Sequence, residues 1–549
     1  MCRLMLRSIS MILLHQLSAY IQPNQTTNKL LSHQSIRHLW CTLPICSNIN
    51  TVGNVNNSLR ICIVGSGPSA MYTVKSLLKL SHSKQYITPI NLYIHIIEKL
   101  PVVFGLVRHG VAPDHIDVKS VQNEFIELLQ DKRVSLYANV TVGDNNNNNI
   151  NTANADTTHH TNTISMQQLR SYYHAIVLAT GALSENQLNV PGCKLNNIYT
   201  AQQFVRWYNA YPHHNNQIQF NSDILHQTDT AVVIGSGNVA LDVSRMLLSP
   251  IHRFTEHNSD LVSYALHSLQ SSTINTVYLL SRRGPIQSSF TIDQLRQLND
   301  IIGIQVIVDP HDLILNESSL SELHTSRANK RKYELLQSIA NNMNNNMNDT
   351  NTKKLYIKFF ASPIQFNSSN DDSNNVASVT YEGTQLIGDP GSQRSISCYP
   401  AQHTTIHSGC VISAIGSINQ PIHGIPFDNK LRIIPNINTR VITNAPCNGQ
   451  SAIHGIYVVG WLRRGATGII GTNIPDGKQC ATAILQDMNN NMLNHPSTDI
   501  IPTVLQNRTV ITLNKWMRIE QCEVEQGKVH KKHREKIHVI DELMKTALD

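Results

Sequence analysis

A glycine-rich loop that follows a short apolar strand and opens a helix occurs twice in this chain. The first copy is Gly65-Ser66-Gly67-Pro68-Ser69-Ala70, and the second is Gly235-Ser236-Gly237-Asn238-Val239-Ala240. The flanking strand, helix and second strand are expected at 59–64, 71–80 and 90–97 for the first copy, and at 231–234, 241–248 and 276–280 for the second. This order of elements is the βαβ unit, in which such a loop binds a dinucleotide.

Each glycine of the loop has a physical task. The first allows the tight turn out of the strand, and the second lets the backbone approach a pyrophosphate. The third position needs a small residue for close packing of helix on strand, and Ala70 and Ala240 meet that need. The N–H groups at the start of the helix then face the phosphates. One loop is a weak signal, but two in this context predict an α/β fold with two dinucleotide sites.

The residues that end the second strand of each unit distinguish the two sites. Glu98 can accept hydrogen bonds from ribose hydroxyls, as FAD or NAD requires, although it lies further from Gly65 than the usual distance of roughly 20 residues. The polar stretch 81–89 explains the extra length. In the second unit Arg282 and Arg283 stand at that place, and paired guanidinium groups favour the 2′-phosphate of NADPH. The alternative for them is a solvated basic pair.

Length and charge narrow the function further. A chain of 549 residues is too long for one ordinary core, and we expect two folded domains with appendages. The formal charge is +7, but residues 1–58 contain four basic residues and no acidic one, which leaves +3 for the rest. A body so mildly basic argues against nucleic acid as the main ligand, although a local basic patch stays open. No run of about 18 apolar residues predicts a transmembrane helix.

Segments outside the repeated units have compositions of their own. Residues 1–58 are acid-free and rich in Ser, Leu and His, which indicates a removed mitochondrial transit peptide; a secretory signal or a misassigned extension are the alternatives. Cys41 and Cys46 lie in this segment, and no Cys-x-x-Cys occurs, so we expect neither a redox disulfide nor a metal site. Polar, Asn-rich tracts at 144–149, 341–351 and 367–375 are expected to be surface insertions.

Five blocks of sequence agree in order and spacing with one known family. They are 64–69, 104–115 (FGLVRHGVAPDH), 237–243 (GNVALDV), 282–292 (RRGP continuing to FTI) and 460–470 (GWLRRGATGII). On these blocks the chain resembles the mitochondrial adrenodoxin reductase family of ferredoxin–NADP reductases from about Leu59 onwards. The resemblance implies two Rossmann-like domains. The FAD-binding domain is expected in two parts, 59–184 and 416–549, and the NADP-binding domain at 185–415 is expected to be inserted between them.

The resemblance also implies which residues hold the cofactors. FAD is expected along Gly65, Gly67, Pro68, Ser69, Ala70 and Glu98, with Leu106, Val142, Trp461, Gly468, Ile469 and Ile470 lining it. NADP(H) is expected on Gly235, Ser236, Gly237, Asn238, Val239, Arg282, Arg283 and Gln294, with its nicotinamide near Gly468. The family pattern has Glu where this chain has Gln294, so that contact is in doubt. For Trp461 the alternative is a core aromatic.

Proton transfer and electron delivery follow from the same resemblance. His115 and Asp242 match residues proposed to relay protons near the flavin; the alternative for His115 is a packed loop histidine. Arg296, Arg327 and Arg331 match positions that dock ferredoxin, and 327–332 is the densest basic cluster of the second domain. The alternative is a solvated charge run. We therefore expect an FAD-dependent NADPH:ferredoxin oxidoreductase of the mitochondrial matrix, monomeric, with an acidic [2Fe–2S] ferredoxin as partner; peripheral contact with the inner membrane stays open.

Three other functions fit the glycine loops. A reductase subunit of an iron–sulfur-linked amidotransferase would carry an upstream Cys cluster, which this sequence lacks. A flavin monooxygenase would use oxygen as acceptor. A cofactor-binding scaffold without turnover would have the loops but no need of the paired arginines or of the block at 460–470.

Overall fold

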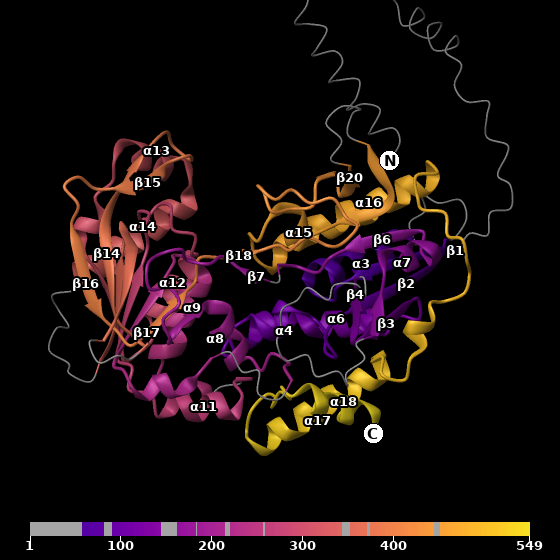
Figure 1. Cartoon of the computed structure of the whole chain (residues 1–549), viewed down its shortest axis with the longest axis horizontal. Coiled ribbons are helices and arrows are strands. Elements are labelled where there is room, and N and C mark those ends of the chain that lie inside the picture. Colours follow the sequence, from indigo (N-terminus) through magenta and orange to yellow (C-terminus); the bar gives the residue numbers. More distant parts are fainter. Residues whose placement is uncertain are drawn as a thin grey trace, which may run out of the picture. The chain divides into compact units, whose positions relative to one another are not determined.

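The computed structural model describes residues 58–81, 90–143, 162–182, 184–214, 220–255, 259–342, 352–369, 374–443 and 451–549. The expected leader, apart from Ser58, and most of the Asn-rich tracts lie outside these residues. Two large sheets of mainly parallel strands, each with helices packed against it, form the centres of the described chain (Figure 1). Within this part of the chain no helix is both long and apolar enough to cross a membrane.

The first sheet has the strand order β19-β20-β21-β6-β1-β2-β3. Its strands are β1 (Ser58–Val64), β2 (Asn91–Glu98), β3 (Val134–Ala138), β6 (Ala175–Leu178), β19 (Asn436–Ile437), β20 (Arg440–Ile442) and β21 (Ala452–Val458). The five strands from β21 to β3 are parallel, and β20 and β19 are antiparallel additions. Helix α3 (Pro68–Ser81) connects β1 to β2 and begins three residues earlier than expected, because the fixed φ of Pro68 suits the first helical position.

The second sheet is parallel throughout and has the order β11-β12-β10-β9-β17-β8. Its strands are β8 (Ile198–Thr200), β9 (Thr230–Ile234), β10 (Thr276–Leu280), β11 (Ile304–Val308), β12 (Lys353–Lys358) and β17 (Cys410–Ser413). Helix α9 (Asn238–Leu248) connects β9 to β10, which gives the second βαβ unit. These strands all lie between β6 and β19 in sequence, so one Rossmann-like domain is inserted into the other, as predicted.

The chain passes between the two sheets at two short strands. Strand β7 (Ser184–Glu185) leads into the second sheet and β18 (Ser417–Ile418) leads back, and the two pair antiparallel. We propose this pairing as the domain boundary, with limits at 184/185 and 415/416. The limits themselves stay a prediction.

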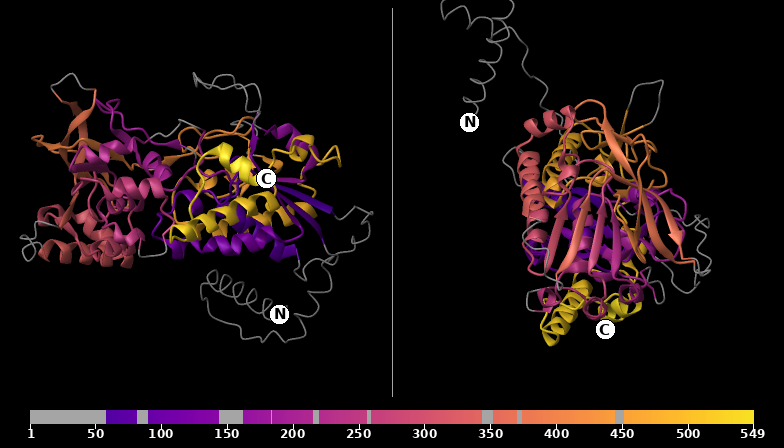
Figure 2. Two further views of the ribbon diagram at one scale, coloured as in Figure 1. Left: turned by 90° about the horizontal axis from the view of Figure 1, so that it is seen from below. Right: turned by 90° about the vertical axis from the view of Figure 1, so that its left-hand side faces the viewer.

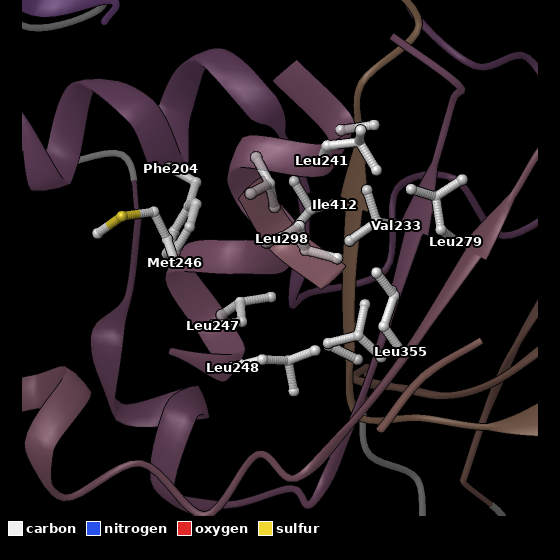
Figure 3. Packing of buried hydrophobic residues seen from close by; sticks show 14 of the residues in the cluster. Phe204, Val233, Leu241, Met246, Leu247, Leu248, Leu279, Leu298, Leu355 and Ile412 are labelled. Carbon is white, nitrogen blue, oxygen red and sulfur yellow. The ribbon is translucent and has the colours of Figure 1, made fainter. Parts of the chain in front are cut away.

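Alternating side chains of the central strands build a separate core on each face of their sheets. In β1, Ile61 and Ile63 pack with α3, whereas Cys62 and Val64 belong to the cluster on the opposite face. In the second sheet Val233 lies in the large cluster of Figure 3, together with Leu241 of α9 and residues from helices around it. This period of two, with both faces apolar, is what a sheet covered on both sides requires.

The remaining elements cover these cores. The helices are α4 (Leu106–His109), α5 (Ile116–Lys119), α6 (Val121–Leu129), α7 (Met166–Tyr172), α8 (Ala201–Tyr208), α10 (His252–Thr255), α11 (Ser263–Gln270), α12 (Ile292–Asn299), α13 (Glu317–Thr325), α14 (Arg327–Asn341), α15 (Trp461–Arg464), α16 (Asn473–Asn489), α17 (Leu513–Val529) and α18 (Ile540–Leu548). An antiparallel sheet of β13 (Ala361–Ser368), β14 (Val376–Ile387), β15 (Arg394–Ser397) and β16 (His403–His407) packs on the second sheet. Helices α17 and α18 pack together, and α17 contacts β3, along one side of the first sheet (Figure 2).

One expectation about the polar tracts is wrong in part. The tract predicted as an insertion at 367–375 begins inside β13, because Asn367 pairs with Ser378 of the neighbouring strand. The Asn367 amide donates to the hydroxyls of Ser378 and Thr380, 3.1 Å away in both cases. Polar cross-strand partners therefore keep this part of the tract in the sheet.

Candidate dinucleotide sites and the groups between them

The first glycine loop turns tightly from β1 into α3. The Gly65 N–H donates to the Ile97 carbonyl at 2.7 Å, and a Cβ at Gly65 would lie 2.5 Å from the Ala179 oxygen. With φ at +106°, this position also needs glycine for its backbone conformation. A Cβ built on Gly67, by contrast, meets nothing within 4 Å. The first glycine is fixed by the protein itself, whereas the second leaves open space at the N-terminus of α3.

Glu98 ends β2 directly beside this loop. Its Oε2 accepts hydrogen bonds from the Ser66 amide at 3.0 Å and from the Ser66 hydroxyl at 2.6 Å. Its Oε1 accepts from the Leu100 amide at 3.0 Å. Burial raises the pKa of the Glu98 carboxyl, and the hydrogen bonds from Ser66 and Leu100 oppose that rise. Glu98 therefore stabilises the conformation of the glycine loop through these hydrogen bonds. Its contact with the ribose of FAD stays a prediction.

The segment predicted to line the flavin returns to the same loop from the far end of the chain. A Cβ on Gly460, after β21, would lie 2.7 Å from the Ser69 Cβ of α3. The indole N–H of Trp461 donates to the Thr467 carbonyl at 2.9 Å, which folds 461–467 into a tight loop. Gly468 has φ at +89° and Ile469 is 65% exposed. Trp461 is half-buried, so the alternative of a core aromatic does not describe it fully.

Leu106 and Val142 are the other residues predicted to line the flavin, and the structure places the start of α4, with Leu106, beside the first glycine loop. Leu106 opens α4 and is 44% exposed. A Cβ on Gly105, just before it, would lie 3.5 Å from the Gly67 Cα, so α4 begins beside the glycine loop. Val142 ends β4 (Val140–Val142), where it is half-buried. Ligand pockets are lined mainly by apolar side chains, so an exposed leucine beside a glycine loop is consistent with contact to a flavin ring that would cover it.

The second glycine loop is held by the segment that follows β10. The Ser236 carbonyl accepts from the amides of Ser289 and Phe290 at 2.8 and 3.1 Å. The Asn238 side chain accepts from the Thr291 amide at 2.8 Å, and Thr291 caps α12. A Cβ on Gly235 would lie 2.3 Å from the Ala414 oxygen, so this loop repeats the constraint found at Gly65. Gly237 has only the Ser289 hydroxyl nearby, at 3.3 Å from such a Cβ. Val239, the second residue of α9, is 48% exposed.

Arg282 and Arg283 follow β10 with exposed side chains. Among the described residues neither guanidinium has a hydrogen bond or an ion pair. The Arg282 backbone is fixed nonetheless, because its carbonyl accepts from the Thr384 hydroxyl at 2.8 Å and from the Ser395 hydroxyl at 2.7 Å. The antiparallel sheet thus holds the backbone of the pair while leaving both positive charges available to an anion.

Gln294 lies on the first turn of α12, next to the second loop. Its Oε1 is buried and has no hydrogen-bond partner among the described residues. A buried amide oxygen without a donor is unusual in a folded protein, so this oxygen is available to a ligand group that donates a hydrogen bond. The family pattern has Glu at this position, and Gln294 still offers an acceptor oxygen for the predicted contact with NADP(H).

His115 and Asp242 come together although they are 127 residues apart in the sequence (242 − 115). Asp242 lies on α9, and His115 precedes α5 and is 12% exposed. Arg245, one turn further along α9, donates to Asp242 at 2.6 Å and forms an ion pair with Asp114. Burial lowers the pKa of His115, the charge of Arg245 lowers it further, and Asp114 and Asp242 act in the opposite direction. His115 is thus packed and also placed among charged groups.

Sequence reasoning missed Arg245 and Asp114 at this site. Two signals were present: Asp242 and Arg245 have the i,i+3 spacing that brings side chains together on a helix, and Asp114 directly precedes His115. The contact between Arg245 and Asp114 spans 131 residues and could not be read from spacing. No group of three or more His, Cys, Asp or Glu side chains in the described chain is arranged to hold a metal ion.

The predicted docking residues are exposed, with two qualifications. Arg296 on α12 lies 3.5 Å from Asp293, which offsets its charge. Arg327 and Arg331 on α14 have no ion-pair partner among the described residues. Lys332 does not belong to the basic surface: it is 4% exposed, and its Nζ donates to the Ser288 carbonyl at 2.5 Å. Lys332 belongs to the basic cluster in sequence but not on the surface, because the period of the helix turns its side chain toward the core.

The described residues fit two dinucleotides. The open space over Gly67, the unpaired guanidinium groups of Arg282 and Arg283, and the unsatisfied oxygen of Gln294 each suit a group that a dinucleotide supplies. Two Rossmann-like domains, one inserted into the other, with paired arginines after strand β10 of the inserted one, define the class of pyridine-nucleotide-linked flavoproteins.

Comparison with known proteins places the chain within this class. Residues 59–282 match the family model described as pyridine nucleotide-disulphide oxidoreductase. The mitochondrial NADPH:adrenodoxin oxidoreductase of Arabidopsis thaliana is 33% identical over 493 residues, covering 89% of this chain and 95% of that protein. The human protein of that name is 34% identical, with coverage of 87% and 90%. The structure of FprA from Mycobacterium tuberculosis in complex with NADPH is 29% identical, with a TM-score of 0.75 over 90% of this chain and 100% of that chain.

The chain belongs to the NADPH:adrenodoxin oxidoreductase family. It is accordingly an FAD-dependent oxidoreductase that uses NADP(H), as the sequence predicted.

Proposed function

We propose that this protein transfers electrons from NADPH through FAD to a [2Fe–2S] ferredoxin in mitochondria. The observation that carries the proposal is the pair of exposed guanidinium groups at Arg282 and Arg283, which have no ion pair among the described residues and follow the strand next to the second of two glycine loops. They supply the charge that selects a 2′-phosphate. The names of relatives that align over almost nine tenths of the chain, NADPH:adrenodoxin oxidoreductase and NADPH-ferredoxin reductase, support the choice of acceptor.

The residues of the chain bind, orient and move protons, and the cofactors supply the redox chemistry. When bound, FAD accepts a hydride from NADPH and passes electrons singly to the acceptor. The loops at Gly65 and Gly235 each direct a helix N-terminus at a pyrophosphate. Trp461 and the Gly468-Ile469-Ile470 backbone form one wall beside the flavin ring. His115 and Asp242 hold and move the proton that accompanies electron transfer.

We infer that an acidic ferredoxin docks on a basic face formed by Arg327 and Arg331 of α14, with Arg296 at its edge. The two arginines of α14 are four residues apart and therefore project from the same side of the helix. Both are exposed, as a rim that attracts an acidic partner must be. Arg296 contributes less, because Asp293 lies 3.5 Å away.

The cellular setting forms part of the proposal. Residues 1–58 direct the protein to the mitochondrial matrix, where it acts as a monomer. The mitochondrial names of the plant and animal relatives support this setting, whereas FprA comes from a bacterium. A reporter fused to residues 1–58 should enter mitochondria; its appearance in the secretory pathway would contradict the proposal.

Reduction of cytochrome c by the purified holoenzyme tests the acceptor. NADPH should drive this reaction strongly when a [2Fe–2S] ferredoxin is added and weakly without it. In the variant Arg327→Glu/Arg331→Glu the ferredoxin-dependent rate should fall, most strongly at low ionic strength, because salt screens rim charges. Direct reduction of ferricyanide, which needs no docking, should stay near the wild-type rate.

The possible results of this assay distinguish the identity of the electron acceptor from the role of the two arginines. A ferredoxin-independent rate equal to the dependent one would contradict the acceptor. Equal loss of both activities in the variant would place the two arginines in the fold or the NADPH site. Arg508→Glu, an exposed arginine of the first domain, is the matched control and should leave both rates unchanged.

A further inference from the structure

Arg245 is a buried cation that joins two segments far apart in the sequence. It lies on α9 of the second sheet's domain, with a side chain only 2% exposed. One of its terminal nitrogens pairs with Asp114, which follows α4 in the first domain, and the other donates to Asp242 at 2.6 Å. A guanidinium stays charged at every accessible pH and can bind two carboxylates in fixed directions. Arg245 therefore fixes both carboxylates at once.

The arrangement leaves one oxygen of Asp114 unused. Asp114 Oδ2 faces Arg245, whereas Oδ1 is buried and has no hydrogen-bond partner among the described residues. This oxygen lies 4.0 Å from Nε2 of His115. A small movement of the His115 ring, or one water between them, would complete a hydrogen bond when the ring gains a proton. Arg245 thus presents an acceptor to His115.

A cavity connects this cluster with solvent. Its volume is about 400 Å³. Its lining is largely ionisable: Asp114, His115, Asp117, Arg245, Arg253 and Asp300, with Val118 and Gln297. Arg253 also approaches Asp114, at 3.9 Å, but its side chain is 32% exposed. A polar cavity of this size holds several water molecules, which can carry protons to His115.

We propose that Arg245 is the positioning residue of a proton site formed by His115, Asp114 and Asp242, and that protons reach this site from solvent through the cavity. The inference rests on the proposed relay role of His115 and Asp242 and deepens it. Arg245 acts only through the two carboxylates that it holds, Asp114 and Asp242.

The charges around His115 determine what loss of Arg245 does. The groups that act on its ring are Arg245 and Lys119, which disfavour the protonated form, and Asp114 and Asp242, which favour it; Asp117, Arg253 and Asp300 line the cavity nearby. Removing Arg245 would leave two carboxylates with no cation between them and the ring. The pKa of His115 should then rise, because the carboxylates that favour its protonated form are no longer offset by the Arg245 charge.

Titration of histidine-labelled holoenzyme by NMR tests the inference without turnover, with His115→Gln to assign the signal. Arg245→Met should raise the titration midpoint of His115 by about one pH unit or more, and Arg245→Lys should raise it less. Asp114→Asn, which keeps Arg245 paired with Asp242, should lower the midpoint. Arg253→Met is the matched control, because it removes a cation of the same cavity without touching Asp242; its shift should be much smaller.

The rate of flavin reduction by NADPH, measured against pH, completes the test. In Arg245→Met the pH above which the rate falls should move upward together with the His115 midpoint, because the protonated ring is the form that supplies the proton taken up when the flavin is reduced. A merely structural loss would lower the rate without moving that pH. An unchanged His115 midpoint in Arg245→Met overturns the inference, and so does a midpoint that fails to fall in Asp114→Asn if the first variant does not fold. A shifted midpoint with an unshifted rate profile supports the placement by Arg245 and contradicts only the relay role.

Discussion

The two predicted dinucleotide sites each depend on single residues whose space or charge the folded protein does not use itself. Gly67 leaves space at a helix N-terminus, and within the part of the chain that the structure describes the guanidinium groups of Arg282 and Arg283 have no hydrogen bond or ion pair. Elsewhere in the described chain, most buried charges are paired, as Asp260 is with Lys119 and Lys536. Residues that lack a partner in the folded protein are therefore the ones to test first for ligand binding.

Substitution of Gly67 separates folding from cofactor binding. Gly67→Ala should leave the free energy of unfolding of the FAD-free protein nearly unchanged, because the added Cβ meets nothing within 4 Å. It should weaken FAD binding at least tenfold, because the methyl group enters the space of the pyrophosphate. Chemical denaturation and titration with FAD give the two quantities.

Gly65→Ala is the contrasting variant. Its Cβ would lie 2.5 Å from the Ala179 oxygen at a φ of +106°, so the FAD-free protein itself should lose about 1–3 kcal/mol or more of stability. Equal destabilisation by the two substitutions would show that Gly67 serves the fold and not the ligand.

Replacement of both arginines should change the choice of coenzyme. In Arg282→Ala/Arg283→Ala the loss is at most about 1.5–3 kcal/mol per residue, and their exposure favours the lower value. The KM for NADPH should therefore rise roughly tenfold for each arginine, while that for NADH barely moves. Steady-state kinetics with ferricyanide measures both constants, and a similar rise for the two coenzymes would show that the pair does not read the 2′-phosphate.

At the scale of elements, the sequence was most informative where local chemistry decides the structure. Strand β10 spans Thr276–Leu280 as predicted, and α3 and α9 begin beside their glycine loops. The sequence did not predict placements that depend on a partner from a distant part of the chain. Asn367 remains in a strand through its cross-strand partners, and Lys332 is buried because α14 packs on the loop after β10. Neither fact follows from the residues next to them.

Lys332 shows how α14 supports the loop beside the NADP site. Burial lowers the pKa of Lys332 to about 8, although its Nζ donates to the Ser288 carbonyl at 2.5 Å. The folded protein therefore releases this proton at lower pH than the unfolded chain, whose lysine has its ordinary pKa near 10.4. The resulting penalty on folding is full below pH 8 and disappears as the pH rises to about 10.4.

Comparison with Lys332→Met makes that penalty measurable. The free energy of unfolding of the wild type, minus that of the variant, should increase by up to about 3 kcal/mol between pH 8 and pH 10.5. Urea denaturation at several pH values measures it. Lys330→Met, which changes an exposed lysine of the same helix, should show no such trend. A difference that stays constant with pH would mean that Lys332 keeps an ordinary pKa.

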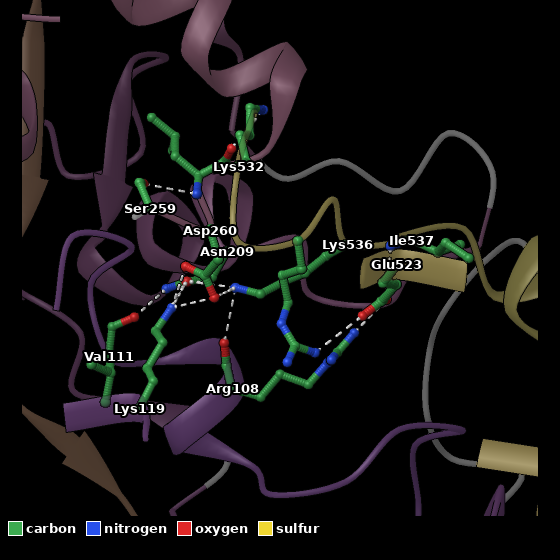
Figure 4. A network of polar contacts seen from close by, with 12 residues as sticks. Arg108, Val111, Lys119, Asn209, Ser259, Asp260, Glu523, Lys532, Lys536 and Ile537 are labelled. Atoms are coloured by element: carbon green, nitrogen blue, oxygen red, sulfur yellow. Dashed lines mark hydrogen bonds and ion pairs between the residues drawn. The ribbon is translucent and has the colours of Figure 1, made fainter. Parts of the chain in front are cut away.

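At the scale of the whole molecule, a buried network joins three parts of the chain (Figure 4). Lys119 comes from the first domain, Asp260 from the inserted domain, and Lys536 from the segment after α17. Asp260 accepts from Lys119 at 2.6 Å and pairs with Lys536 at 2.7 Å, and Asn209 accepts from both lysines at 3.2 Å. The C-terminal segment thus contributes to holding the two domains together.

The two lysines on one carboxylate predict an unequal pair of variants. Asp260→Asn leaves two buried ammonium groups without a counter-charge and should cost about 3–5 kcal/mol. Lys119→Met leaves Asp260 paired with Lys536 and should cost much less.

The charges of Lys119 and Lys536 outweigh burial and hold the pKa of Asp260 below its ordinary value. Its contribution is therefore present above about pH 4 and is lost as the pH falls, so the deficit of Asp260→Asn should shrink in acid. Thermal unfolding followed by flavin fluorescence and by far-UV circular dichroism measures both variants. Because the network spans the domains, the two signals should coincide in the wild type and separate in Asp260→Asn. Coincident transitions in that variant, or a larger loss in Lys119→Met, would show that the network does not join the domains.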